Sequence, residues 1–152
     1  MIIVRVVRGI TDHFPARASE WALASMLMLW GHILLVSPGI FESSTSFREL
    51  ASFASESTWG VACLTMGGLR LIALFVNGSF PRFRYSPHVR AVMSYFSCYF
   101  WFAISFGILL SQVPTTDLAV YPVLLLLDVY NGQRAACDAR EADEVARNAA
   151  YC

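Results

Sequence analysis

The stretch that decides the fold is VRAVMSYFSCYFWFAISFGILLSQV, which runs from Val89 to Val113. Its only charged residue is Arg90, close to its start. An α-helix of about 20 apolar residues crosses the roughly 30 Å of hydrocarbon in a bilayer, and a tilted helix needs a few more. The run therefore predicts a transmembrane helix over residues 89–112.

The composition of the whole chain supports a membrane location. Of the 152 residues, 57% are hydrophobic and 14% are charged, against about 45–50% and about 25% in soluble domains. One domain over residues 1–152 is expected at this length. Eleven basic residues balance eleven acidic ones, so nothing in the overall charge favours binding to nucleic acid.

Three further apolar runs predict transmembrane helices over residues 18–36, 58–76 and 116–134. The first is followed by Ser37-Pro38-Gly39 and the second by Asn77-Gly78, and both sequences favour turns. The apolar part of the last run, Leu118 to Tyr130, contains Pro122 and needs its polar flanks to reach spanning length. The chain is thus predicted to be all-α, with four transmembrane helices.

The arginines predict the orientation of these helices, because cytoplasmic loops are enriched in basic residues. The segments before the first span, between the second and third, and after the fourth are basic. Their arginines are Arg5, Arg8 and Arg17, then Arg82, Arg84 and Arg90, then Arg134, Arg140 and Arg147. The other two connections hold Arg48 alone, so we expect both termini on the cytoplasmic side.

Three segments outside the spans have helical patterns of their own. Residues 1–17 are expected to lie at the membrane interface, with Ile3, Val7, Ile10 and Phe14 on one helical face, although the β-branched residues leave a strand open. Residues 37–57 form an outer connection in which the capping-box spacing of Ser46 and Glu49 predicts a short surface helix. Residues 135–152 are expected to form a cytoplasmic helical tail, with opposite charges four residues apart.

Arg70 is the most informative single residue, because a charge inside a transmembrane helix usually faces a partner or water. Asp128 lies at a compatible depth, near the inner end of the fourth predicted span. We predict that the two side chains face each other as an intramembrane ion pair. The pair would lock two helices together, and the alternative is an ion or proton relay.

Two other groups of residues suggest contacts rather than chemistry. Small residues in the second span would let another helix approach closely; they are Gly60, Cys63, Gly67 and Gly68. Arginine and aromatic residues around the inner connection are typical of contacts with lipid headgroups; they are Arg82, Arg84, Tyr85 and Arg90.

The sequence contains no motif that predicts catalysis. It has no nucleophile beside a base, no glycine-rich phosphate loop and no paired catalytic carboxylates. The three histidines are expected at different depths, and the four cysteines lack the spacing of a zinc site. We therefore expect no enzymatic activity, no catalytic residues, no metal site and no cofactor.

Two segments carry a resemblance to a known group of proteins. Ser86-Pro87-His88-Val89-Arg90-Ala91, and Ala119 to Leu124 with Asp128 to Asn131, resemble small four-span membrane proteins encoded by tailed bacteriophages and prophages. The resemblance implies a location in the inner membrane of a bacterial host and a role in lysis or in modifying the envelope. The four spans and the long outer connection depart from common holins, the phage proteins that open the membrane.

Three functional hypotheses follow. The first is a non-enzymatic membrane protein that associates with itself or with a membrane protein partner in the lipid bilayer, without nucleic acid. The second is a holin-like or channel-forming protein that permeabilises the membrane. The third is a small ion-coupled transporter that uses Arg70 and Asp128.

Overall fold

The computed structural model describes residues 2–79 and 85–150, with side chains for residues 17–77 and 85–149. Helices make up almost all of this part of the chain, and it contains no strand. In chain order they are α1 (Ile2–Val36), α2 (Ile40–Ser43), the 3-10 turn η1 (Thr45–Phe47), α3 (Arg48–Phe53), α4 (Glu56–Ser79), α5 (Ser86–Leu110) and α6 (Asp117–Ala150). The prediction of an all-α protein is confirmed.

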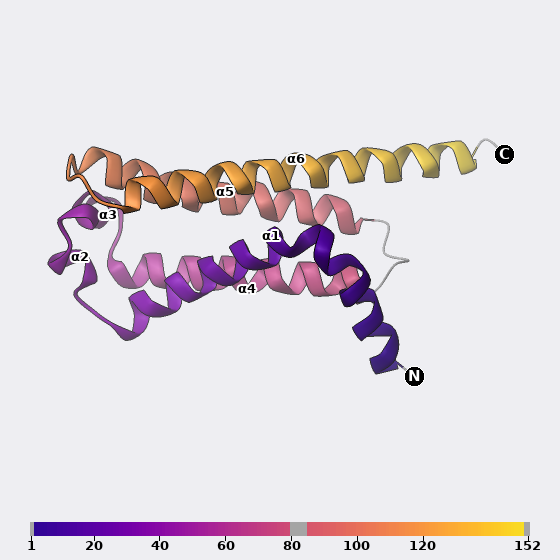
Figure 1. Cartoon of the computed structure of the whole chain (residues 1–152), viewed down its shortest axis with the longest axis horizontal. Coiled ribbons are helices and arrows are strands. Elements are labelled where there is room, and N and C mark those ends of the chain that lie inside the picture. Colours follow the sequence, from indigo (N-terminus) through magenta and orange to yellow (C-terminus); the bar gives the residue numbers. More distant parts are fainter. Residues whose placement is uncertain (1, 80–84, 151–152) are drawn as a thin grey trace.

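The four long helices, α1, α4, α5 and α6, form an elongated bundle (Figure 1). Helix α1 packs mainly on α4, and α6 packs mainly on α5. The short helices α2 and α3 cover one end of the bundle, while both chain termini lie towards the other end. There the last turns of α6 extend beyond the other helices (Figure 1).

In the part of the chain that the structure describes, three helical segments are long and apolar enough to cross a membrane. They are Arg17–Val36, Glu56–Asn77 and Ser86–Leu110, and they match the spans predicted over residues 18–36, 58–76 and 89–112. Helix α6 is not among them, because its short apolar part continues into a charged segment. Length and composition thus support three of the four predicted spans.

The predicted fourth span and the predicted tail form one continuous helix. Helix α6 contains 34 residues and includes Pro122 without a break in the helix. Proline removes one backbone hydrogen bond within a helix, and its position close to the start of α6 limits that effect. The predicted segments 116–134 and 135–152 therefore differ in composition, but their described residues belong to the same helix.

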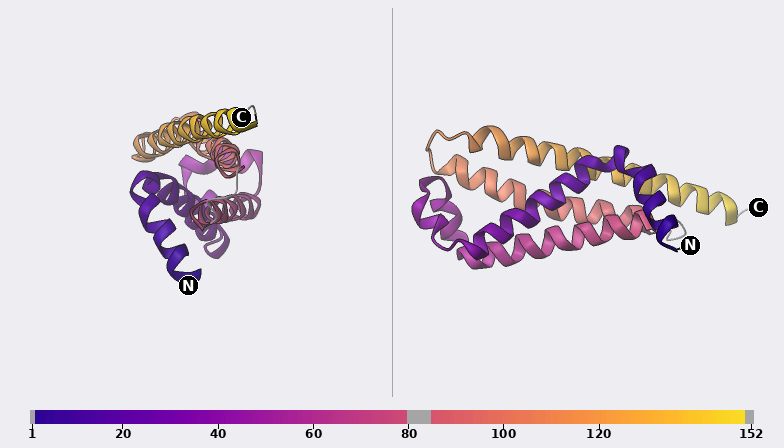
Figure 2. Two further views of the ribbon diagram at one scale, coloured as in Figure 1. Left: turned by 90° about the vertical axis from the view of Figure 1, so that its right-hand side faces the viewer. Right: turned by 60° about the horizontal axis from the view of Figure 1, so that its bottom comes forward.

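The N-terminal segment is also part of a longer helix, since α1 begins at Ile2. The structure is helical over residues 2–17, which excludes the strand alternative. The start of α1 turns away from the rest of that helix (Figures 1 and 2), and Pro15 supplies a physical reason because it lacks a backbone N–H. The predicted apolar face of this segment lies outside the described side chains.

The outer connection contains α2, η1 and α3, so it does form short helical structure. The predicted capping box is wrong, because no side chain caps η1 or α3 and Ser46 is buried within η1. Packing fixes this segment instead. Leu50 of α3 lies against Gly107 of α5, and its carbonyl accepts a hydrogen bond of 3.1 Å from Trp59 Nε1.

A carboxylate joins the end of α1 to the start of α4. Gly39, with a left-handed φ of 94°, reverses the chain after α1. The backbone N–H groups of Gly39, Ile40 and Phe41 donate to the carboxylate of Glu56 at 3.1–3.2 Å. These bonds satisfy donors at a helix start that would otherwise lack partners, so they hold the two helices together at this end.

Small residues bring α1 and α4 into close contact, as the second predicted span suggested. A Cβ added at Gly67 would lie 2.6 Å from the backbone N of Met28, and one at Gly31 would lie 2.6 Å from the backbone O of Gly60. Cys63 is fully buried. Gly68 is the exception, because a Cβ there would have no neighbour within 4 Å. Gly68 therefore does not pack against the described part of this chain, since the next residue along a helix lies about 100° around its axis.

Replacing the two neighbouring glycines tests this interface. Gly67→Ala places its Cβ against the backbone of α1 and should lower stability by about 1–3 kcal/mol. Gly68→Ala should leave the stability unchanged or raise it by up to about 1 kcal/mol, because alanine favours helix. Thermal unfolding in detergent measures both changes, and an equal loss of stability in the two variants would contradict the packing described.

Candidate functional site: two buried polar layers

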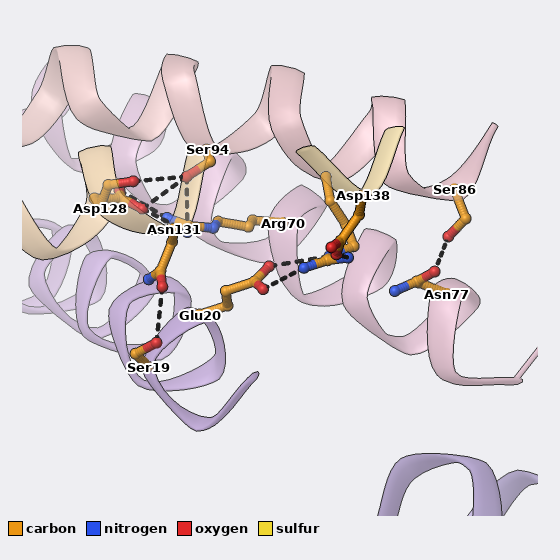
Figure 3. A network of polar contacts seen from close by, with 10 residues as sticks. Ser19, Glu20, Arg70, Asn77, Ser86, Ser94, Asp128, Asn131 and Asp138 are labelled. Carbon is orange, nitrogen blue, oxygen red and sulfur yellow. Dashed lines mark hydrogen bonds and ion pairs between the residues drawn. The ribbon is translucent and has the colours of Figure 1, made fainter. Parts of the chain in front are cut away.

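Arg70 of α4 and Asp128 of α6 form a buried ion pair (Figure 3). The Nη2–Oδ1 distance is 2.5 Å and the Nη1–Oδ2 distance is 2.8 Å, so the contact is bidentate. The side chains are 2% and 0% exposed. The structure thus brings together the two charges that the sequence placed at similar depth.

Two serines of α5 complete this first polar layer. Ser97 Oγ accepts a hydrogen bond of 2.8 Å from Arg70, and Ser94 Oγ accepts one of 3.3 Å. The Ser94 hydroxyl lies 3.0 Å from both the carbonyl and the carboxylate oxygen of Asp128. Three helices therefore share a neutral cluster, and the added hydrogen bonds offset part of the desolvation of the two charges.

A second polar layer surrounds Arg90 near the start of α5. Its guanidinium donates to the Glu20 carboxylate of α1 at 3.2 and 2.5 Å and to Asp138 of α6 at 3.0 Å. Arg90 is only 3% exposed. The prediction that Arg90 contacts lipid headgroups is wrong, because carboxylates from two other helices enclose it.

A direct hydrogen bond between α1 and α6 lies close to both layers. Ser19 Oγ of α1 donates to Asn131 Oδ1 of α6 at 2.8 Å. Figure 3 shows Asn131 beside Arg70 and Glu20 beside Asp138. The two layers together connect all four long helices.

The other predicted headgroup residues belong to the connection between α4 and α5. Tyr85, directly before α5, is exposed, and its ring lies 6.1 Å from that of His88. Arg82 and Arg84 lie outside the described residues. His88 Nε2 lies 3.1 Å from the Asp143 carboxylate, so the start of α5 also contacts the extended part of α6.

The chemistry that this arrangement offers is charge pairing between helices. Both buried arginines have carboxylate partners, and the acids and bases occupy one another's hydrogen-bonding groups. In the described part of the chain, no three His, Cys, Asp or Glu side chains come close enough to hold a metal ion. The geometry supports a structural role for the network.

Comparison with known proteins found no matching protein family, no related curated protein and no similar solved structure. Three apolar helices of sufficient length are compatible with a multi-pass membrane protein.

Sequence reasoning missed the partners of Arg90 and the close packing of Gly31 of α1 against α4. Glu20 and Arg90 each stand near the inner end of a predicted span, so matching charges by depth would have paired them as it paired Arg70 with Asp128. Asp138 was less accessible to this reasoning, because its position among other tail charges suggested pairing along the helix surface. Gly31 gave no signal, since no second glycine accompanies it in its run.

A charge exchange tests the first polar layer. Arg70→Asp and Asp128→Arg should each lower stability by about 3–5 kcal/mol, because each leaves buried charge without a partner. The double variant should recover much of this loss, since the pair is restored with its polarity reversed. Chemical unfolding of the detergent-solubilised chain measures the three values.

Arg140→Asp is a matched control, because Arg140 lies on the exposed surface of α6. It should leave stability within about 0.5 kcal/mol of the parent value. Single variants as stable as this control would show that the Arg70–Asp128 contact does not support the fold.

Proposed function

We propose that this chain is a four-span protein of a bacterial inner membrane, with α6 as the fourth span and both termini in the cytoplasm. The exposed surface of α6 supports this placement. It is apolar from Val120 to Tyr130, and Leu126 is 68% exposed. From Gln133 onward the exposed residues are mostly polar or charged, among them Arg134 and Arg140.

The buried pair removes the main obstacle to inserting α6. An isolated charge in hydrocarbon is costly, whereas Asp128 pairs with Arg70 and Ser94 inside the bundle. The exposed apolar part of α6 is short, about 15 Å at 1.5 Å per residue from Val120 to Tyr130. Its neighbours in the bundle and snorkelling of Arg134 would accommodate the mismatch.

Topology reporters test this placement. An alkaline phosphatase fused after Pro114 should be active outside the cytoplasm, and a fluorescent protein fused after Cys152 should fluoresce in the cytoplasm, because α6 would separate the two positions. A fluorescent protein that stays dark after Cys152, together with phosphatase activity when alkaline phosphatase is fused there instead, would place the C-terminus outside and contradict four spans.

We further propose that the protein works without catalysis, by associating with other copies of itself in the membrane. The observation that carries this proposal is a row of exposed aromatic side chains on α5. Its members are Tyr95, Phe96, Tyr99, Phe102 and Phe106. They recur at helical spacing, so they form one face of the helix.

The geometry of this aromatic face suits contact with another helix. Val92, Tyr95, Phe96, Tyr99 and Phe100 line an apolar groove of about 650 Å³. Tyr99 is 62% exposed although it lies midway along α5, whereas aromatic residues that face lipid concentrate at the two interfaces. Aromatic pairs contribute roughly 0.5–1.5 kcal/mol beyond the area they bury, so the same face on a second copy is a favourable partner.

Energy transfer between labelled copies tests the association. Chains carrying donor or acceptor fluorescent proteins at the C-terminus, mixed in liposomes, should show transfer that falls as lipid is added. Tyr99→Ala with Phe102→Ala should weaken association at least about tenfold, the effect of about 1.4 kcal/mol, so that transfer falls at a lower lipid dilution than in the parent chain.

Leu69→Ala with Ile72→Ala provides the control, because both residues are exposed on α4 and outside the aromatic face. This variant should keep the parent level of energy transfer. Transfer that is absent from the parent chain, or equally reduced in both variants, would contradict self-association through α5.

The two alternative functions gain less support from the geometry. The holin-like hypothesis relied on the small-residue face of the second span, but Gly60 and Gly67 are occupied by α1 of the same chain. The transporter hypothesis relied on Arg70 and Asp128, which bind each other and two serines. A phage origin follows from the sequence resemblance alone.

A further inference from the structure

A groove of about 700 Å³ opens beside the second polar layer, between α1, α5 and α6. Its charged lining comes from all three helices: Arg17, Arg90, Arg134, Asp138 and Glu141. Pro87, Val145 and three alanines of α6 supply apolar walls. The charged part of this lining is suited to a polar group that carries both signs of charge.

The groove presents both signs of charge. Glu20 and Asp138 bind Arg90, while Arg17 and Arg134 add guanidinium groups, and Asp138 and Glu141 keep carboxylate surface accessible. A simple anion would meet the carboxylates, and a simple cation would meet the arginines. A ligand with a phosphate beside an ammonium group complements both.

The proposed membrane placement puts the arginine end of this groove at the level of the lipid headgroups, while its walls at Val145 and Ala149 extend into the cytoplasm. Arg17 begins the first apolar segment, Arg90 lies near the start of α5, and Arg134 follows the point at which the exposed surface of α6 changes from apolar to polar. Basic pockets between transmembrane helices on the cytoplasmic side are known to bind headgroups.

We infer that the groove binds the phosphate–ammonium group of phosphatidylethanolamine, an inference that rests on the proposed membrane placement but not on self-association. Guanidinium groups bind phosphate through paired hydrogen bonds, which suits Arg17 and Arg134. A primary ammonium has three donors for the carboxylates of Asp138 and Glu141. Phosphatidylcholine lacks these donors, and phosphatidylglycerol lacks the cation.

Lipid binding to the full chain in detergent tests the inference. Native mass spectrometry with added phosphatidylethanolamine, phosphatidylcholine or phosphatidylglycerol gives the three affinities, and soluble O-phosphoethanolamine is added as a competitor. Phosphatidylethanolamine should bind about tenfold more tightly than the other two, the difference expected for one charge-assisted contact.

Two exposed groove residues and two matched neighbours separate the site from general charge effects. Arg134→Gln should weaken phosphatidylethanolamine binding about tenfold, and Glu141→Gln should remove the preference over phosphatidylglycerol. Arg140→Gln and Glu144→Gln change the same charges on exposed positions of α6 outside the groove lining. These two controls should bind as the parent does.

Selective binding of the phospholipid that is lost in the groove variants, with weak competition by O-phosphoethanolamine, supports a lipid site; strong competition supports the same chemistry for a soluble ligand. Equal binding of all three lipids, or equal losses in groove and control variants, overturns the inference. A chain that stays monodisperse without detergent would instead overturn the membrane placement, which is a separate measurement.

Discussion

The bidentate contact between Arg70 and Asp128 is the interaction on which the bundle depends. Each residue alone would leave a charge in an apolar helix, and only the two together allow α4 and α6 to be buried against α5. Ser94 and Ser97 extend the contact to α5, so one cluster fixes the relative position of three helices. Apolar packing alone would not specify this arrangement as closely, because apolar side chains tolerate sliding that a bidentate pair does not.

The arrangement of small and large residues complements this electrostatic constraint. Gly31, Gly60 and Gly67 bring the α1 and α4 backbones close together, which suits helices that cannot gain from a hydrophobic effect within lipid. At the end with α2 and α3, Glu56 binds three backbone N–H groups and Leu50 fills the space over Gly107. The bundle is thus held by polar contacts at both ends and by close helix packing between them.

The sequence predicted the features whose physical signal is local. Apolar runs predicted the three confirmed helices, and the rarity of charge within such runs predicted that Arg70 needs a partner such as Asp128. Features that depend on the surroundings were not predicted: Arg90 looked like a headgroup contact until Glu20 and Asp138 enclosed it. Gly68 matched a packing pattern, but its position around the helix axis points it away from the rest of the described chain. Ser46 matched a capping pattern, but tertiary packing buries it within η1.

The distribution of polar groups along the bundle also bears on what a single copy can do. Both polar layers lie in the half of the bundle from which α6 extends, because Arg70 is in the second half of α4 and Arg90 is close to the start of α5. Towards α2 and α3, the described interior is built mainly from large apolar residues such as Trp101, Ile104 and Ile108. A conducting path needs polar groups or water along its whole length, and the described side chains of a single copy supply them along only part of the bundle. The buried charges are occupied within the chain, so the self-association proposed above would involve the exposed aromatic face of α5 instead.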